Sequence, residues 1–195
     1  MQYSWKLDKH QVLFSKYFQL EELSLSHELF GGGYSNIFTR EIFERGSVAA
    51  LLPYDPERRK VVLIEQFRAG AIGDEKTPWL LECVAGVIEE GESEEQVAIR
   101  ESREEAGCEI KQLHQISRHY VSPGGTTELC TLYCGIIDSK GVGGIHGLAD
   151  ENEDIRVEVV DVDQAYAMVR DGRIKSSPAI IALLWLELNE QRLTG

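Results

Sequence analysis

Residues 86–108 read GVIEEGESEEQVAIRESREEAGC, a stretch that contains signals for the start and the end of a helix. Ser93, with Gln96 three residues later, forms a capping-box pattern, which predicts the start of a helix. Gly107 predicts its end, because glycine readily adopts the left-handed conformation found after the last helical turn. The stretch therefore predicts a loop, a helix over residues 94–106 and a second turn.

The same stretch is strongly acidic. Between residues 86 and 110, nine acidic residues stand against two basic ones. At about 100° per residue on a helix, Glu101, Glu104 and Glu105 project to one side, where like charges repel. Clustered oxygen ligands without His or Cys suit Mg²⁺ or Mn²⁺, so the pattern indicates a divalent-cation site. On charge alone, a solvated acidic helix face remains the alternative.

Net charge and composition restrict the class of protein. The 195 residues carry a formal charge of −13, and residues 86–110 and 150–154 together hold 11 of those negative charges. Nucleic acids and anionic membranes need a positive protein face, so neither is an expected partner. The N-terminus lacks the pattern of a secretory signal, and the longest apolar run, residues 179–186, is too short to span a membrane. We expect a cytoplasmic protein whose four cysteines are buried and reduced, without a zinc site.

The rest of the chain shows strand and helix patterns without a regular βαβ repeat. Residues 11–46 predict antiparallel strands around a glycine turn at Gly31–Gly33. Further strands are expected at residues 48–52, 61–67, 80–84, 114–121, 129–137 and 156–160, a loop at 138–154, and helices at 163–170 and 177–189. The expected fold class is α/β (α+β), a mixed sheet flanked by helices, with residues 1–46 as an N-terminal antiparallel β extension and residues 47–195 as the main domain.

The spacing of the fixed residues in the acidic stretch resembles the Nudix box. The pattern G-x5-E-x7-R-E-U-x-E-E-x-G-U, in which U is aliphatic, is matched at all seven fixed positions. Chance agreement at that level is on the order of one in 10⁷ per start point. Ser102 departs from the pattern because it stands at an aliphatic position. The resemblance to Nudix hydrolases implies an α/β/α sandwich in which a loop, helix and loop hold divalent cations against a pyrophosphate.

The resemblance also implies roles for individual residues of the box. Glu101, Glu104 and Glu105 would be carboxylate ligands of Mg²⁺, or of Mn²⁺, and the carbonyl of Ala85 a further ligand, with Glu105 also counted as catalytic. Gly86, Glu92, Arg100 and Gly107 would support the box. The glycines allow sharp turns, and an arginine can hold neighbouring carboxylates through forked hydrogen bonds.

Segments outside the box are similar to the ADP-ribose pyrophosphatases within this family. Pro123 lies 15 residues past the box, and the segments PWLLECVAG (78–86), SPGGTTE (122–128) and GIHGLADENEDIRV (144–157) carry further agreement. This resemblance implies hydrolysis of ADP-ribose to AMP and ribose 5-phosphate. It assigns the catalytic base to Glu151, with Glu153 as a further metal ligand or support, and the choice between these two as base stays open.

Substrate contacts and a homodimer follow from the same resemblance. The expected substrate residues are Arg68 together with Arg40 or Arg45 for the phosphates, Tyr17 or Phe18 for the adenine, and Ser122, Pro123, Gly124 and Glu128 for the terminal ribose. Residues 1–46 would be the dimerisation element. Two alternatives stay open: an enzyme acting on another nucleotide sugar such as GDP-mannose, and a non-catalytic ADP-ribose sensor on the same fold.

Overall fold

A computed structural model describes residues 3–148 and 152–193 of the chain. Its contacts divide the chain into two compact units. The first comprises the chain up to Ser47 together with His119–Leu129, and the second comprises Val48–Arg118 and the chain from Cys130 onward.

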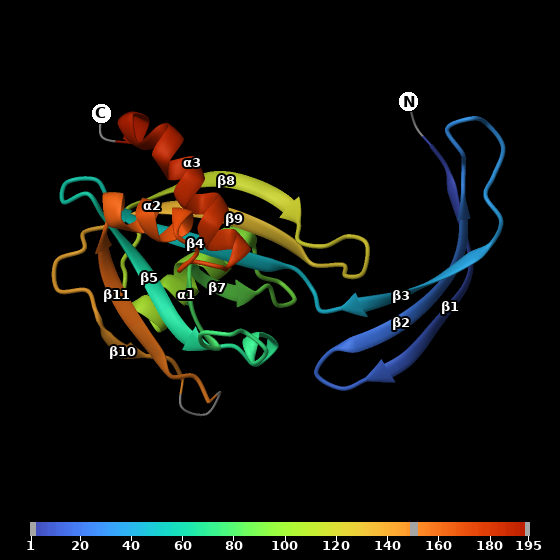
Figure 1. Cartoon of the computed structure of the whole chain (residues 1–195), viewed down its shortest axis with the longest axis horizontal. Helices are drawn as coiled ribbons and strands as arrows, with labels where there is room; N and C mark the ends of the chain where they lie inside the picture. The colour runs from blue at the N-terminus through green and yellow to red at the C-terminus, as the bar shows by residue number, and fades with distance from the viewer. Residues whose placement is uncertain (1–2, 149–151, 194–195) are drawn as a thin grey trace. The chain divides into compact units, whose positions relative to one another are not determined.

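The first unit is built on a three-stranded antiparallel sheet, drawn in shades of blue in Figure 1. Its strands are β1 (Trp5–Ser15), β2 (Gln19–His27) and β3 (Phe38–Glu44), in that order. The predicted glycine turn lies between β2 and β3, where Gly32 and Gly33 have φ angles of 87° and 79° that favour glycine. The Phe43 N–H donates to the carbonyl of Gly125 at 2.8 Å, which joins β3 to the segment after β8.

The second unit contains an eight-stranded mixed sheet and the helices that cover it. Its main path runs β10-β11-β5-β4-β9-β8, with β6 paired to β5 and β7 paired to β4. The strands are β4 (Val48–Asp55), β5 (Lys60–Phe67), β6 (Trp79–Glu82), β7 (Val84–Val87), β8 (Gln112–Tyr120), β9 (Leu129–Ile136), β10 (Gly144–His146) and β11 (Ile155–Asp161). The helices are the 3₁₀ turn η1 (Ala69–Ala71), α1 (Glu94–Ala106), α2 (Val162–Arg170) and α3 (Ser177–Leu193).

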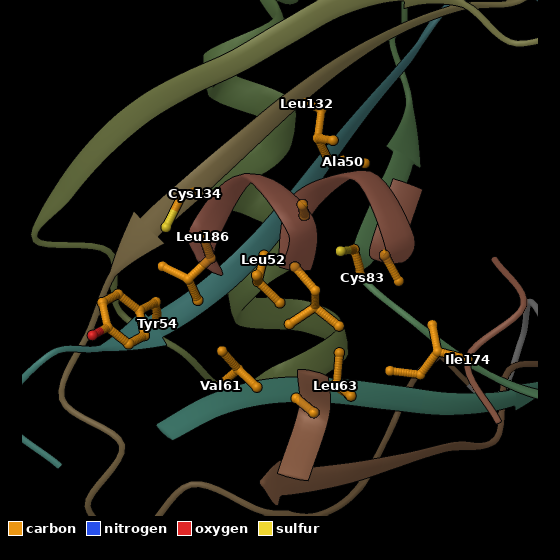
Figure 2. Close-up of a cluster of buried hydrophobic side chains, with 14 of the residues drawn as sticks. Ala50, Leu52, Tyr54, Val61, Leu63, Cys83, Leu132, Cys134, Ile174 and Leu186 are labelled. Carbon is orange, nitrogen blue, oxygen red and sulfur yellow. The ribbon is translucent and has the colours of Figure 1, made fainter. Parts of the chain in front are cut away.

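Helices cover both faces of this sheet, and β4 shows the resulting alternation. Ala50, Leu52 and Tyr54 pack toward α2 and α3, in the cluster shown in Figure 2. Ala49 and Leu51 point the opposite way and pack with residues of α1. All eight residues of β4 are buried, as expected for a strand covered on both faces. The predicted α/β fold with a mixed sheet between helices is confirmed.

Three strand predictions are wrong in detail, each because pairing depends on distant residues. β4 continues through Pro53, whose missing N–H is tolerated because neither β5 nor β7 is registered with Leu52 or Pro53. The expected strand at residues 80–84 is two short strands that pair with different neighbours, β6 with β5 and β7 with β4. The expected loop at 138–154 contains the short strand β10, which pairs with β11.

All four cysteines are free and buried, as the sequence predicts. Cys83, Cys130 and Cys134 belong to the cluster beneath α3, and Cys108 packs on the α1 side of the sheet. Within the described residues, none of the helices is both long enough and apolar enough to cross a membrane.

Asp55, at the end of β4, is a buried hydrogen-bond acceptor that fixes two loops. It is 1% exposed, and its carboxylate accepts from the amides of Glu57 and Arg58, the Arg58 guanidinium, and the amide and hydroxyl of Ser139. Burial alone would raise the pKa of Asp55, but the hydrogen bonds from Ser139 and Arg58 outweigh it and hold the pKa well below its ordinary value of 3.8.

Replacing Asp55 with alanine should lower the free energy of unfolding by about 3 kcal/mol, because several buried donors lose their acceptor. Guanidinium unfolding at neutral pH measures this. Since the folded pKa is depressed, the contribution is fully present above the ordinary value of 3.8 and is lost as pH falls below it. Asp161→Asn, which breaks the exposed pair with Lys60, is the matched control and should change stability by less than about 1 kcal/mol. An equal effect of the two substitutions would contradict the role of Asp55.

Candidate functional site

Helix α1 begins and ends at the residues that the sequence indicates. The Ser93 hydroxyl accepts from the Gln96 amide at 3.2 Å, and the Gln96 side chain accepts from the Ser93 amide at 2.8 Å, which completes the capping box. Gly107 ends the helix in the left-handed conformation with φ 61°. Ser102, the departure from the box pattern, is fully buried, and its hydroxyl donates to the Cys108 carbonyl at 3.1 Å. That bond satisfies the polar group, so a serine is accommodated at an otherwise aliphatic position.

Arg100 holds three glutamates of the acidic stretch together. Its Nε and Nη2 donate to both carboxylate oxygens of Glu92 at 3.1 and 3.2 Å. Its Nη1 donates to Glu101 at 2.7 Å and to Glu104 at 3.1 Å. These charged hydrogen bonds raise the pKa of Arg100 and lower the pKa of Glu92. Arg100 therefore fixes the orientation of Glu101 and Glu104 on one side of α1.

Glu105 is the most buried carboxylate of the cluster. It is 3% exposed and accepts a hydrogen bond from the Ala85 amide at 2.9 Å. Burial is the main cause that raises the pKa of Glu105 to about 8, and the nearby charges of Glu101 and Glu153 raise it further. The Ala85 amide and Arg68 act in the opposite direction. This bond to β7 places the Glu105 carboxylate next to Ala85, whose carbonyl is an expected metal ligand.

Glu101 lies directly against Gly86. A Cβ atom added at Gly86 would be 1.9 Å from the Glu101 carboxylate oxygen and 2.6 Å from its Cγ, so no residue with a side chain fits there while Glu101 stays in place. Burial raises the pKa of Glu101, Arg100 lowers it, and Glu104 and Glu153 raise it. The box glycine thus leaves the space that the Glu101 side chain fills.

Glu153, which follows β10 in the chain, also contributes charge to this site. Glu153 acts electrostatically on both Glu101 and Glu105, so it lies in the same charged environment. Its amide donates to the Leu148 carbonyl at 3.1 Å. The predicted base, Glu151, lies outside the described residues, and its placement remains a prediction.

The oxygen donors of this cluster fit a hard divalent cation. Across residues 3–148 and 152–193, no three His, Cys, Asp or Glu side chains converge as a ready-made metal-binding group. The charge of Glu101 nevertheless adds to the burial that raises the pKa of Glu105, and a bound cation would offset this cost of ionising Glu105. The all-oxygen donor set suits Mg²⁺. Glu101, Glu105 and the Ala85 carbonyl are the groups that would hold it.

Arg68 supplies positive charge beside this cluster. It follows β5, acts electrostatically on Glu105, and donates from Nε to Glu82 at 2.6 Å. Glu82 is a residue of this site that the box pattern does not include. Its only signal in the sequence is an acidic side chain within the otherwise apolar segment at residues 79–85.

The other expected substrate residues belong to the first unit. Arg45 pairs with Glu128 at 3.2 Å, and its guanidinium lies 5.6 Å from the centre of the Phe18 ring. Tyr17 packs edge-on against Phe18 and is 85% exposed. Arg40 lies instead over the ring of Phe38 and donates to the carbonyl of Thr39. Ser122, Pro123 and Gly124 lie in the turn after β8, where the Ser122 carbonyl accepts from the amides of Gly125 and Thr126. Arg45, Glu128 and Phe18 are therefore brought together within this unit.

The raised pKa of Glu105 predicts that rising pH lowers the stability of the metal-free protein and increases the stabilisation that Mg²⁺ provides. Because that pKa is about 8 instead of 4.5, the folded protein binds more protons than the unfolded chain between these values. In EDTA, stability should therefore fall by roughly 2–4 kcal/mol as pH rises through that window. Mg²⁺ binds the ionised carboxylate, so it should raise the unfolding temperature more near pH 8.5 than near pH 6. Calorimetry measures both effects. If the stability of Glu105→Gln in EDTA depended on pH as that of the wild type does, Glu105 would not be the group responsible.

Comparisons with known proteins indicate the family to which the chain belongs. The NUDIX domain model matches residues 44–182. The chain is 51% identical to ADP-ribose pyrophosphatase of Escherichia coli (strain K12) over 183 residues, covering 94% of this chain and 88% of that protein. It is 45% identical to ADP-ribose pyrophosphatase of Haemophilus influenzae, with 94% and 86% covered, and 32% identical to GDP-mannose pyrophosphatase of Citrobacter koseri, with 92% and 93% covered.

A solved structure described as an ADP compounds hydrolase shares the fold. It superposes with a TM-score of 0.70 at 17% sequence identity, and the match covers 98% of this chain and 97% of that one. The family match covers most of the chain and includes the whole acidic stretch from Gly86 to Cys108. The chain therefore belongs to the Nudix family.

Proposed function

We propose that this protein is a Nudix pyrophosphohydrolase that hydrolyses ADP-ribose to AMP and ribose 5-phosphate with Mg²⁺. The observation that carries the proposal is the arrangement of Glu105 and Glu101 against Ala85 and Gly86, because it brings oxygen donors, one of them the buried Glu105 carboxylate, together with the cationic side chains of Arg68 and Arg100. The choice of ADP-ribose is supported by the 51% and 45% identical relatives, which carry that substrate in their names.

Each group in the proposed site has a defined task. Mg²⁺, when bound, supplies positive charge for the phosphate oxygens and lowers the pKa of a water molecule. Glu101 and Glu105 would hold the cation, and Arg100 keeps Glu101 in its orientation. The water oxygen attacks one phosphorus of the pyrophosphate, the bond from that phosphorus to the bridging oxygen breaks, and the proton of the water passes to a carboxylate. We assign that carboxylate to Glu151, with Glu153 as the alternative.

The substrate is tested with a panel of nucleotides. Purified protein and Mg²⁺ are incubated with ADP-ribose, GDP-mannose, NADH and Ap4A, and products are separated by chromatography. The proposal predicts the highest kcat/KM for ADP-ribose, with AMP and ribose 5-phosphate as products. A higher kcat/KM for GDP-mannose would mean that GDP-mannose, and not ADP-ribose, is the preferred substrate. GDP-mannose is the relevant alternative because a GDP-mannose pyrophosphatase is 32% identical to this chain.

The cation and the compartment are assigned on chemical grounds. Mg²⁺ is proposed because the donors are all hard oxygens, and Mn²⁺ accepts the same set. A cytoplasmic location is proposed because all four cysteines are free and buried, which suits a reducing compartment.

A homodimer is also proposed, with the first unit as its dimerisation element. Every residue of β1 is exposed, and the strand presents large apolar side chains such as Trp5 and Phe14, 68% and 53% exposed. An exposed apolar strand of this kind is typical of an interaction surface. Light scattering should give twice the mass of the 21.9 kDa chain, and the double substitution Trp5→Asp and Phe14→Asp should shift it toward the monomer. A monomeric wild-type protein at micromolar concentration would contradict this proposal.

A further inference from the structure

Arg68 is anchored at two points where β5 ends. Its amide donates to the Pro78 carbonyl at 2.9 Å, which extends the pairing of β5 with β6 by one residue. Its Nε donates to the Glu82 carboxylate at 2.6 Å. Glu82 itself lies on β6, registered with Ile64 of β5, and its side chain is 14% exposed. Both ends of this ion pair are therefore held by the same strand pair.

The pair lies on the face of the sheet that carries the acidic cluster. Side chains alternate along a strand, so Ile64 and Arg68 share a face, and Ile64 packs with Ala106 of α1. Arg68 lowers the pKa of Glu105, which places its charge within electrostatic range of that carboxylate. The Ala85 amide, three residues after Glu82, donates to Glu105. The short segment 82–85 therefore binds both Arg68, through Glu82, and Glu105, through Ala85.

The hydrogen bond uses only one of the five N–H donors of the guanidinium. Nε is occupied by Glu82, and Nη1 and Nη2 make no hydrogen bond within the described residues. The guanidinium is partly exposed, with the Arg68 side chain at 43%. Glu82 adds a negative charge to a site that already contains Glu101 and Glu105, which is unfavourable unless that charge orients a cation.

We propose that Glu82 is a positioning residue that fixes the Arg68 guanidinium by its Nε edge and leaves the Nη edge to bind the pyrophosphate oxygens of the substrate. The inference rests on the proposed function, because it requires a substrate with a pyrophosphate. Glu82 does not touch the substrate. Its contribution is the orientation of a planar donor group, which would otherwise have to be ordered when the substrate binds.

The test compares single and double substitutions by steady-state kinetics. Glu82→Ala should raise KM for ADP-ribose about tenfold and leave kcat within about twofold, because binding is lost equally in the ground and transition states. Glu82→Gln keeps an acceptor for Nε, so its KM should lie closer to that of the wild type than to that of Glu82→Ala. In an Arg68→Ala background, Glu82→Ala should change KM less than about twofold, because the residue acts through Arg68. Additive effects in the double variant, or an unchanged KM in Glu82→Ala, would overturn the proposal.

A matched control separates this role from a general effect of breaking an ion pair. Glu65, on the opposite face of β5, pairs with Arg156. Glu65→Ala should leave KM unchanged. Calorimetric titration of ADP-ribose gives Kd for the same variants without requiring turnover, so the positioning role can be tested even if wild-type protein does not hydrolyse ADP-ribose. A tenfold higher Kd in Glu82→Ala with inactive wild type would retain the positioning role and reject the proposed hydrolysis.

Discussion

Glu105→Gln is expected to lower kcat for ADP-ribose by about a thousandfold, the scale seen when a buried charge-stabilising group is removed. Glu105 is 3% exposed and its carboxylate oxygen accepts from the Ala85 amide. Glutamine keeps an acceptor for that amide and nearly the same volume, but it removes the negative charge that a cation requires. The fold should therefore survive, while Mg²⁺-dependent hydrolysis is lost.

Unfolding and binding measurements make this result interpretable. Near pH 8 the variant should be at least as stable as wild type in EDTA, because burial of an ionised carboxylate no longer opposes folding. Glu109→Gln is the control, since Glu109 is an exposed acid just beyond the box that pairs with Arg103. It should retain nearly full activity. More than about a tenth of wild-type kcat in Glu105→Gln would contradict a metal-binding role for Glu105.

Gly86→Ala is expected to lower kcat/KM by about a hundredfold without removing any ionisable group, since small displacements of catalytic groups have effects of this size. The new Cβ would lie 1.9 Å from the Glu101 carboxylate oxygen, and Cδ and Cγ are also within 3 Å. The whole Glu101 side chain must therefore move, and with it the hydrogen bond from Arg100. Stability should change little, because the atoms that clash belong to a side chain and not to the backbone.

Gly73→Ala is the matched control for this substitution. A Cβ at Gly73 would meet no atom within 4 Å, so its kinetics should equal those of wild type. A calorimetric titration with Mg²⁺ should show weaker binding in Gly86→Ala and unchanged binding in the control. Wild-type activity in Gly86→Ala would mean that the position of Glu101 does not matter for catalysis.

Local signals explain why helix α1 could be predicted to the residue. Its capping box and terminal glycine act on neighbouring backbone groups, so the sequence contains all the interactions that set its ends. The predicted projection of Glu101, Glu104 and Glu105 to one side also follows from helix geometry alone. Arg100 pairs with Glu104, four residues later, as that geometry suggests, and its guanidinium also reaches the adjacent Glu101.

The remaining features depend on residues far apart in the chain. The split of residues 80–84 into β6 and β7 is decided by pairing with β5 and β4. The Arg68–Glu82 pair joins residues 14 positions apart through the register of two strands. Neither arrangement has a local signal, because strand pairing depends on tertiary contacts. The box pattern therefore predicts the acidic cluster but not the pairing of Arg68 with Glu82.

The most direct test of the account is whether the wild-type protein cleaves ADP-ribose when Mg²⁺ is present. Protein and ADP-ribose are incubated with Mg²⁺ or with EDTA, and AMP and ribose 5-phosphate are quantified by chromatography. We expect equal amounts of the two products with Mg²⁺, none above background in EDTA, and a rate about a thousandfold lower with Glu105→Gln. Tight binding of ADP-ribose that leaves it intact in the presence of Mg²⁺ would contradict the account and identify a non-catalytic sensor.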